Sequence, residues 1–161
     1  KELENSQYCI VSQYNGAELK SLLENPENIR ILYIYDSEYL TYFSKDTEKW
    51  SAHYNYFVCW KGLEIAAIAK TKPVLNNLDK KILELVYMEV VTKHQNEGIA
   101  TLLTKDVFKY CNKFNYIFKT CPYTKIGEIK LKPLFNSLAE KMALTFIDYD
   151  LGDWVEKNYA S

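Results

Sequence analysis

Glycine and proline are scarce in this sequence, with 5 and 4 residues respectively among 161. No segment is of low complexity, and apolar residues make up 48% of the chain. This composition argues against disorder except at the two ends. A chain of this length favours one folding unit, so we predict a single domain over residues 1–161.

Long apolar runs and an excess of one charge are also absent. No run approaches the ~20 apolar residues that a helix needs to span a bilayer, and the polar segment Lys1–Tyr8 does not resemble a signal peptide. The formal net charge is -1, which disfavours binding of nucleic acid by the whole surface. We therefore expect a cytoplasmic protein that binds neither a membrane nor, through its global charge, nucleic acid.

Cysteine and histidine do not form a metal-binding pattern. None of the four cysteines belongs to a C-x-x-C pair, and neither His53 nor His94 lies at zinc-ligand spacing from them. We expect no metal site and interpret the cysteines as reduced, mostly buried thiols. They are Cys9, Cys59, Cys111 and Cys121.

Hydrophobic periodicity predicts strands separated by three helices. The strands are expected at Tyr8–Gln13, Ile29–Tyr35, Tyr54–Trp60, Leu63–Lys70, Lys81–Val91, Tyr116–Thr120 and Phe146–Tyr149, with another possible at Trp154–Tyr159. The helices are expected to begin after Asn15, at Ile99 and near Lys132. Glu38–Ser51 is ambiguous, and Pro73–Asp79 is expected to form turns.

Local signals fix some of these boundaries. Asn15 and Glu18 have the spacing of a capping box at the start of a helix. Gly62 permits the positive φ of a tight hairpin after Lys61. Pro133 suits the first turn of the last helix. The near-continuous apolar run Lys81–Val91 predicts a central strand that is covered on both faces.

The most informative segment follows that strand. A polar loop turns at Gln95, and a helix begins after Gly98, with the slim residue Ala100 in its first turn. The N-terminus of a helix carries unpaired N–H groups and roughly half a positive charge. A loop that directs several N–H groups into one concavity binds anions such as pyrophosphate. An ordinary strand-to-helix turn is the plainer alternative.

At this point the sequence resembles the GNAT N-acetyltransferase superfamily. The family motif has Gln or Arg, two residues, Gly, one residue, and Gly or Ala, and it stands here as Gln95, Gly98 and Ala100. The motif is short, but the strand before it and the helix after it occur in the family's order. The resemblance covers roughly Leu63–Tyr149 well and the N-terminal part loosely.

The resemblance implies an α/β (mixed α+β) fold. Its central mixed, mostly antiparallel sheet would have about six or seven strands flanked by helices, with one parallel, splayed strand pair. Acetyl-coenzyme A (acetyl-CoA) would lie in the opening. The residues implied to bind it are Val90 and Val91 at the pantetheine arm, and Gln95, Asn96, Glu97, Gly98, Ile99, Ala100 and Thr101 at the pyrophosphate.

Transfer of an acetyl group to an amine needs a group that accepts the amine's proton, because an aliphatic amine has a pKa near ~10. Glu84 and Glu89 on the long strand are the candidates, and strand alternation places them on opposite faces. Glu84-Leu85-Val86-Tyr87 resembles the segment around the general base of the histone-acetyltransferase branch, which favours Glu84. A strand-end charge or a surface ion pair is the alternative for each.

The acid for the leaving thiolate is less evident. Many family members use a helix tyrosine, and the corresponding position here is Lys141. Tyr123 is the fallback, and a thiol with a pKa near ~8.5 can leave with little help. Cys121 has no activating neighbour in sequence. His94 is expected at the loop rim, in contact with solvent or a phosphate.

These residues predict an acyltransferase that acetylates a primary amine by direct attack in a ternary complex. The acceptor, a protein lysine, a protein N-terminus or a small amine, stays open. The alternative is a non-catalytic GNAT-fold module that binds CoA or a protein. The resemblance also makes a homodimer through the last strands an option.

Overall fold

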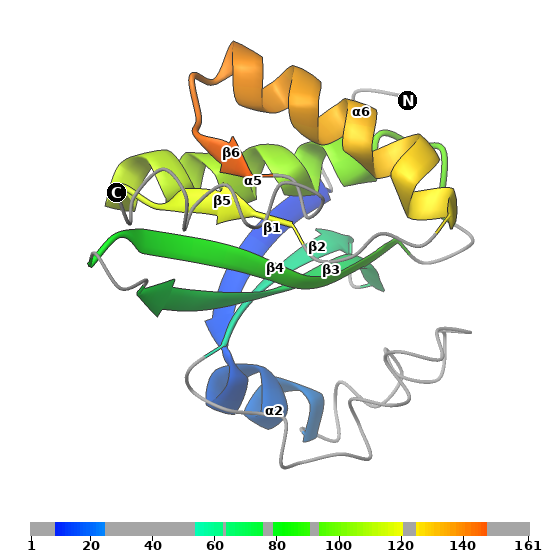
Figure 1. Ribbon diagram of the computed structural model, residues 1–161. Coiled ribbons are helices and arrows are strands. Elements are labelled where there is room, and N and C mark those ends of the chain that lie inside the picture. Colours follow the sequence, from blue (N-terminus) through cyan, green and yellow to red (C-terminus); the bar gives the residue numbers. More distant parts are fainter. Residues whose placement is uncertain are drawn as a thin grey trace. The chain divides into compact units, whose positions relative to one another are not determined.

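The computed structural model describes residues 9–24, 54–62, 64–75, 79–90, 94–120 and 125–147 (Figure 1). The helices are α2 (Gly16–Glu24), α5 (Ile99–Phe114) and α6 (Lys125–Lys141). The strands are β1 (Cys9–Asn15), β2 (Asn55–Lys61), β3 (Glu64–Leu75), β4 (Lys81–Val90), β5 (Ile117–Lys119) and β6 (Phe146–Ile147). The segments Ile29–Tyr35, Glu38–Ser51 and Trp154–Tyr159 lie outside the described residues.

The strands form one mixed sheet in the order β1-β2-β3-β4-β5-β6. β1 pairs antiparallel with β2. The short links from β2 to β3 and from β3 to β4 also require antiparallel neighbours, because a parallel crossover needs a dozen or more residues. β5 runs parallel to β4 and also, over two residue pairs, to β6. The predicted fold class is confirmed, and the contact of β5 with β6 adds a second parallel pairing.

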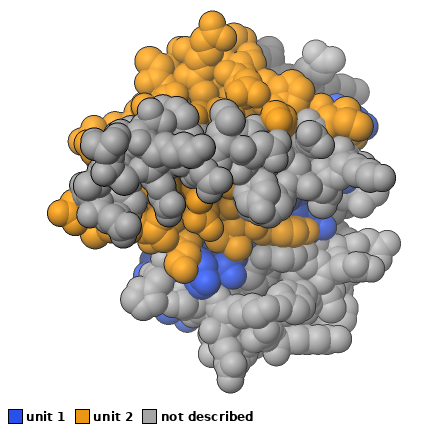
Figure 2. Space-filling model, in the orientation of Figure 1, with its two compact units in different colours: residues 1–70, 88–103 blue, residues 71–87, 104–161 orange. Residues whose placement is uncertain are grey.

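The chain divides into two compact units (Figure 2). Unit 1 comprises residues 1–70 and 88–103, and unit 2 comprises residues 71–87 and 104–161. The boundary passes through β3, β4 and α5. Unit 1 therefore contains the loop after β4 and the first turn of α5, and unit 2 contains the pairing of β4 with β5.

In unit 1, α2 begins at the predicted capping box. The backbone N–H of Asn15 donates to Glu18 Oε1 at 2.9 Å, and the N–H of Glu18 donates to Asn15 Oδ1 at 2.8 Å. The apolar face of α2 then places Leu19, which is fully buried, in the core of the unit. The buried residues packed in that cluster are Leu19, Tyr56, Val58, Ile65 and Ile68.

In unit 2, four phenylalanines connect α5, β5, α6 and β6. The ring of Phe118 lies 4.8 Å from that of Phe108, 5.6 Å from that of Phe135 and 5.9 Å from that of Phe146, measured between centroids. Phe108, Phe118 and Phe135 are each at most 1% exposed. This aromatic cluster joins α6 to α5 and β5, since edge-on and tilted ring pairs add to the stabilisation from burial.

Two predicted details are wrong. α6 begins at Lys125, well before Lys132, and contains Pro133 in its interior. Pro133 is exposed, and so is Ile129 one turn earlier, so water can reach the carbonyl that loses its helical partner. β3 continues through Pro73 to Leu75, because the fixed φ of proline suits extended backbone.

No helix in the described ranges is both long enough and apolar enough to cross a membrane.

Candidate functional site

The loop between β4 and α5 places a glycine at the start of the helix. The first intrahelical hydrogen bond runs from the N–H of Leu102 to the carbonyl of Gly98 at 3.1 Å, so Gly98 is the N-cap. Its φ is +78°, in the region that favours glycine. A Cβ added to Gly98 would meet nothing within 4 Å. The backbone conformation therefore demands glycine here, and the space beside it is open.

The same end of α5 is suited to an anion. Gly98 has no side-chain oxygen that could accept from the first-turn N–H groups, as a Ser, Thr, Asp or Asn cap would. Residues 95–98 are exposed, whereas Ile99 is buried at 3% exposure and anchors the helix. The positive end of the helix dipole thus faces an accessible surface. Asn96 also has a positive φ, +66°, a left-handed conformation that asparagine adopts more readily than most residues.

Gln95, the first residue of the motif, ties the loop to the preceding strand. Its Nε2 donates to the carbonyl oxygen of Val90 at 3.2 Å. Because a carbonyl has two lone pairs, the Val90 oxygen can accept a second hydrogen bond. Gln95 therefore sets where the loop leaves β4, and its amide is already used within the protein.

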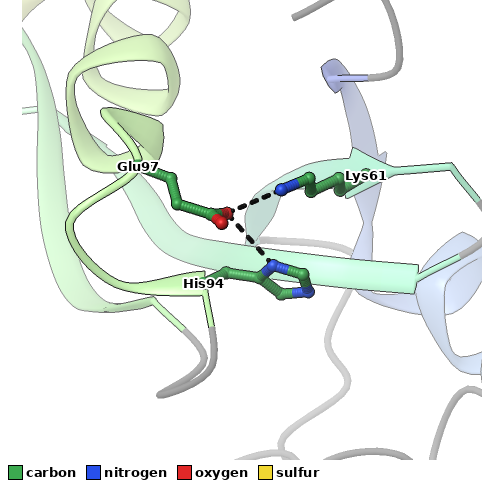
Figure 3. A network of polar contacts seen from close by, with 3 residues as sticks. All are labelled: Lys61, His94 and Glu97. Atoms are coloured by element: carbon green, nitrogen blue, oxygen red, sulfur yellow. Dashed lines mark hydrogen bonds and ion pairs between the residues drawn. The ribbon is translucent and has the colours of Figure 1, made fainter. Parts of the chain in front are cut away.

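Glu97, directly before the cap, joins the loop to the end of β2 (Figure 3). Its Oε1 accepts a hydrogen bond from Lys61 Nζ at 2.8 Å and lies 3.2 Å from His94 Nδ1. These bonds, with the Lys61 bond contributing most, hold the pKa of the Glu97 carboxyl below its ordinary value. Glu97 is therefore ionised and paired near neutral pH.

The solvent exposure of His94 differs from the prediction. This residue is only 5% exposed, so the expected contact with solvent is wrong, while the contact with a phosphate stays a prediction. The ring directs Nδ1 at Glu97, three residues on (Figure 3). A His–Glu pair at this spacing is a weak sequence signal. Lys61, 36 residues before Glu97, gives no local signal at all.

The two candidate bases lie on β4, and both are half-buried. Glu84 belongs to unit 2 and stands opposite Lys119 of β5 in the strand register. Glu89 belongs to unit 1 with Val90. Lys141 is the exposed last residue of α6.

The structure brings Gln95, Asn96, Glu97, Gly98, Ile99, Ala100 and Thr101 together on one loop and helix start, as their sequence adjacency requires. Val91, Cys121 and Tyr123 lie outside the described residues. The thiols of Cys59 and Cys111 are buried, and that of Cys9 is half-buried.

Comparison with family models and with curated protein sequences gives no match. Solved structures do match. One is the aminoglycoside acetyltransferase HMB0005 from an uncultured soil metagenomic sample, at a TM-score of 0.61 and 14% identity over 81% of this chain and 90% of that one. A GNAT family acetyltransferase of Staphylococcus aureus matches at a TM-score of 0.54 and 13% identity, covering 73% and 88%.

The aminoglycoside N-acetyltransferase AAC(6')-Iy, in complex with CoA, matches at a TM-score of 0.51 and 14% identity, covering 84% of this chain and 87% of that one. At such identities the likeness concerns the fold. The chain has the fold of the GNAT acetyltransferases, which confirms the fold that the resemblance predicted.

Proposed function

We propose that this protein is an N-acetyltransferase that moves the acetyl group of acetyl-CoA to a primary amine. The observation that carries the proposal is the open N-terminus of α5. Gly98 caps the helix with a φ of +78° and open space beside it, at the position where the GNAT motif predicts the pyrophosphate. The GNAT fold supports the same assignment.

In this proposal two segments bind acetyl-CoA. One is the loop and helix start at residues 95–101, and the other is the end of β4. Backbone N–H groups from Gln95 to Thr101 bind the pyrophosphate, helped by the positive end of the α5 dipole. Val90, the last residue of β4, and Val91, which follows it in the sequence, offer backbone groups to the pantetheine arm. The open space beside Gly98 lets a phosphate oxygen approach the backbone closely.

The reaction is a direct attack of the amine nitrogen on the thioester carbon. The new C–N bond forms as the C–S bond breaks, and the thiolate of CoA leaves with the electron pair. A carboxylate on β4 accepts the proton of the amine, directly or through one water. Glu84 is our preferred base and Glu89 the second candidate. The thiolate, whose conjugate acid has a pKa near ~8.5, takes a proton from water or from Tyr123.

The acceptor is a primary amine whose identity is open. Matching structures include aminoglycoside acetyltransferases, so an amino sugar is one class to screen. Protein lysines and protein N-termini are the others. If the protein binds acetyl-CoA but acetylates no amine, the non-catalytic CoA-binding module becomes the better description.

The decisive experiment is calorimetric titration of acetyl-CoA into the native protein and two glycine variants. Gly62 is a matched control, because it also has a positive φ, +62°, and open space where a Cβ would lie. Gly98→Glu and Gly62→Glu therefore impose similar backbone strain. We expect a micromolar Kd for the native protein, about -8 kcal/mol.

Gly62→Glu should bind with a similar Kd, whereas Gly98→Glu should bind at least tenfold more weakly, about 1.4 kcal/mol, because its carboxylate repels the pyrophosphate. Equal losses in both variants would assign the effect to folding. Absence of binding by the native protein would refute the proposal.

A further inference from the structure

The carboxylate of Glu97 raises an electrostatic problem for an anion site at the N-terminus of α5. Glu97 directly precedes the cap residue Gly98, and its carboxylate is ionised at neutral pH. A carboxylate at this position repels a phosphate that approaches the N-terminus of α5. It is also an anion that can itself accept from the first-turn N–H groups, because a helix N-terminus favours any nearby negative charge.

The structure resolves this conflict through Lys61. Lys61 is the last residue of β2, and its Nζ lies 2.8 Å from Glu97 Oε1. The buried ring of His94 approaches the same oxygen at 3.2 Å. All three residues belong to unit 1 (Figure 3). The carboxylate of Glu97 is thus held by Lys61 and His94, and it does not turn toward the N–H groups at the start of α5.

We propose that Lys61 is a positioning residue for the cofactor site, which holds Glu97 away from the N-terminus of α5 and fixes the loop 94–98 in the shape that receives the pyrophosphate. This inference rests on the proposed binding of acetyl-CoA. The ammonium of Lys61 acts through Glu97, and it offsets the charge that would otherwise oppose the cofactor.

A direct contact between Lys61 and a CoA phosphate is the competing explanation, and a double-mutant cycle separates the two. The variants are Lys61→Met, Glu97→Gln and the double variant, with Lys72→Met as a control at an exposed lysine of β3. We expect Lys61→Met to raise the Kd for acetyl-CoA about tenfold, as expected for an unpaired charge at the site.

In the Glu97→Gln background, Lys61→Met should change the Kd by less than about threefold, because the carboxylate that Lys61 restrains is gone. Lys61→Arg should restore most of the affinity, since arginine keeps the ion pair. Lys72→Met should leave the Kd unchanged. A tenfold loss from Lys61→Met in both backgrounds would instead mean a direct phosphate contact and would overturn the inference.

A second measurement needs no cofactor. Amide hydrogen exchange of residues 94–101 in the ligand-free protein should become faster in Lys61→Met than in Lys72→Met, and by more than in the remainder of the chain, which reports any loss of global stability. Unchanged exchange in Lys61→Met would refute the positioning role. If the native protein failed to bind acetyl-CoA, the proposed function would fall, while this exchange measurement would still decide whether Lys61 fixes the loop.

Discussion

Glu84 lies opposite Lys119 in the last residue pair of the parallel contact between β4 and β5. β5 ends at Lys119, whereas β4 continues to Val90. Glu84 is half-buried and, within the described ranges, forms no ion pair. In the proposed reaction this carboxylate, in the last residue pair of the β4–β5 contact, accepts the proton of the amine.

We therefore predict that Glu84→Gln lowers kcat about 10²- to 10⁴-fold on whichever amine is acetylated, the usual contribution of a general base. The Kd for acetyl-CoA should change less than twofold. Glu89→Gln, on the same strand, is the matched control and should retain most of the activity. Steady-state kinetics from pH 6 to 9 provide the measurement. A loss confined to Glu89→Gln would transfer the role to Glu89.

The hydrogen bond from Gln95 to the carbonyl of Val90 predicts a modest contribution to the binding of acetyl-CoA. Gln95→Ala removes the bond and leaves the loop less constrained at its first residue, so acetyl-CoA should bind about 3- to 10-fold more weakly, the range of one ordinary hydrogen bond. Gln13→Ala, at an exposed glutamine of β1, should have no effect on the Kd. An unchanged Kd in Gln95→Ala would mean that the loop holds its shape without this bond.

The lowered pKa of the Glu97 carboxyl predicts how stability depends on pH. Because the folded-state pKa lies below the unfolded value, near 4.5, the ion pair stabilises the fold above that pH and loses its contribution as pH falls through the folded-state pKa. The effect should be small, because the Glu97 side chain is exposed to solvent, which screens the ion pair. Urea unfolding should show the native protein more stable than Glu97→Gln at pH 6–7, with the difference shrinking as the pH is lowered below 4.5. A constant difference at both pH values would contradict the pairing.

The parts of the fold that are predictable from sequence depend on local chemistry. Asn15 and Glu18 are three residues apart, and their reciprocal bonds need nothing but the first turn of α2. The GNAT motif likewise combines a strand end, a glycine and a helix start within one short segment. In both cases the residues that define the feature are neighbours in the chain.

The parts that sequence reasoning misses depend on contacts between distant segments. Lys61 reaches Glu97 across 36 positions, and no pattern in either segment identifies the other. His94 is buried although its neighbours in sequence are polar, because burial is decided by what packs around the loop. Pro133 by itself indicates a helix start, but the tertiary packing of Phe135 extends α6 to both sides of it.

Cys111 offers a test of how tightly α5 is packed in unit 2. Burial raises the pKa of its thiol to about 12, so little thiolate forms near neutral pH. We expect iodoacetamide at pH 8 to modify Cys111 only after unfolding, whereas the half-buried Cys9 reacts faster in the folded protein. Peptide mass spectrometry against time measures both rates. Equal rates for the two thiols in folded protein would show that α5 opens locally.

The end of α6 predicts a stabilising substitution. Ala143 has a φ of +52°, and the N–H of Leu144 donates to the carbonyl of Ala139 at 2.9 Å, the arrangement in which glycine is usually found. An alanine in this left-handed conformation costs roughly 1 kcal/mol or more, although glycine loses more freedom on folding. Ala143→Gly should therefore raise the free energy of unfolding by about 0.5–1 kcal/mol, or roughly 1–4 °C in Tm. Ala139→Gly, the same change inside the helix, should lower stability by about 1 kcal/mol. The thermal and urea unfolding midpoints of the two variants should thus shift in opposite directions. A loss of stability in both variants would mean that the left-handed φ of residue 143 does not destabilise the end of α6.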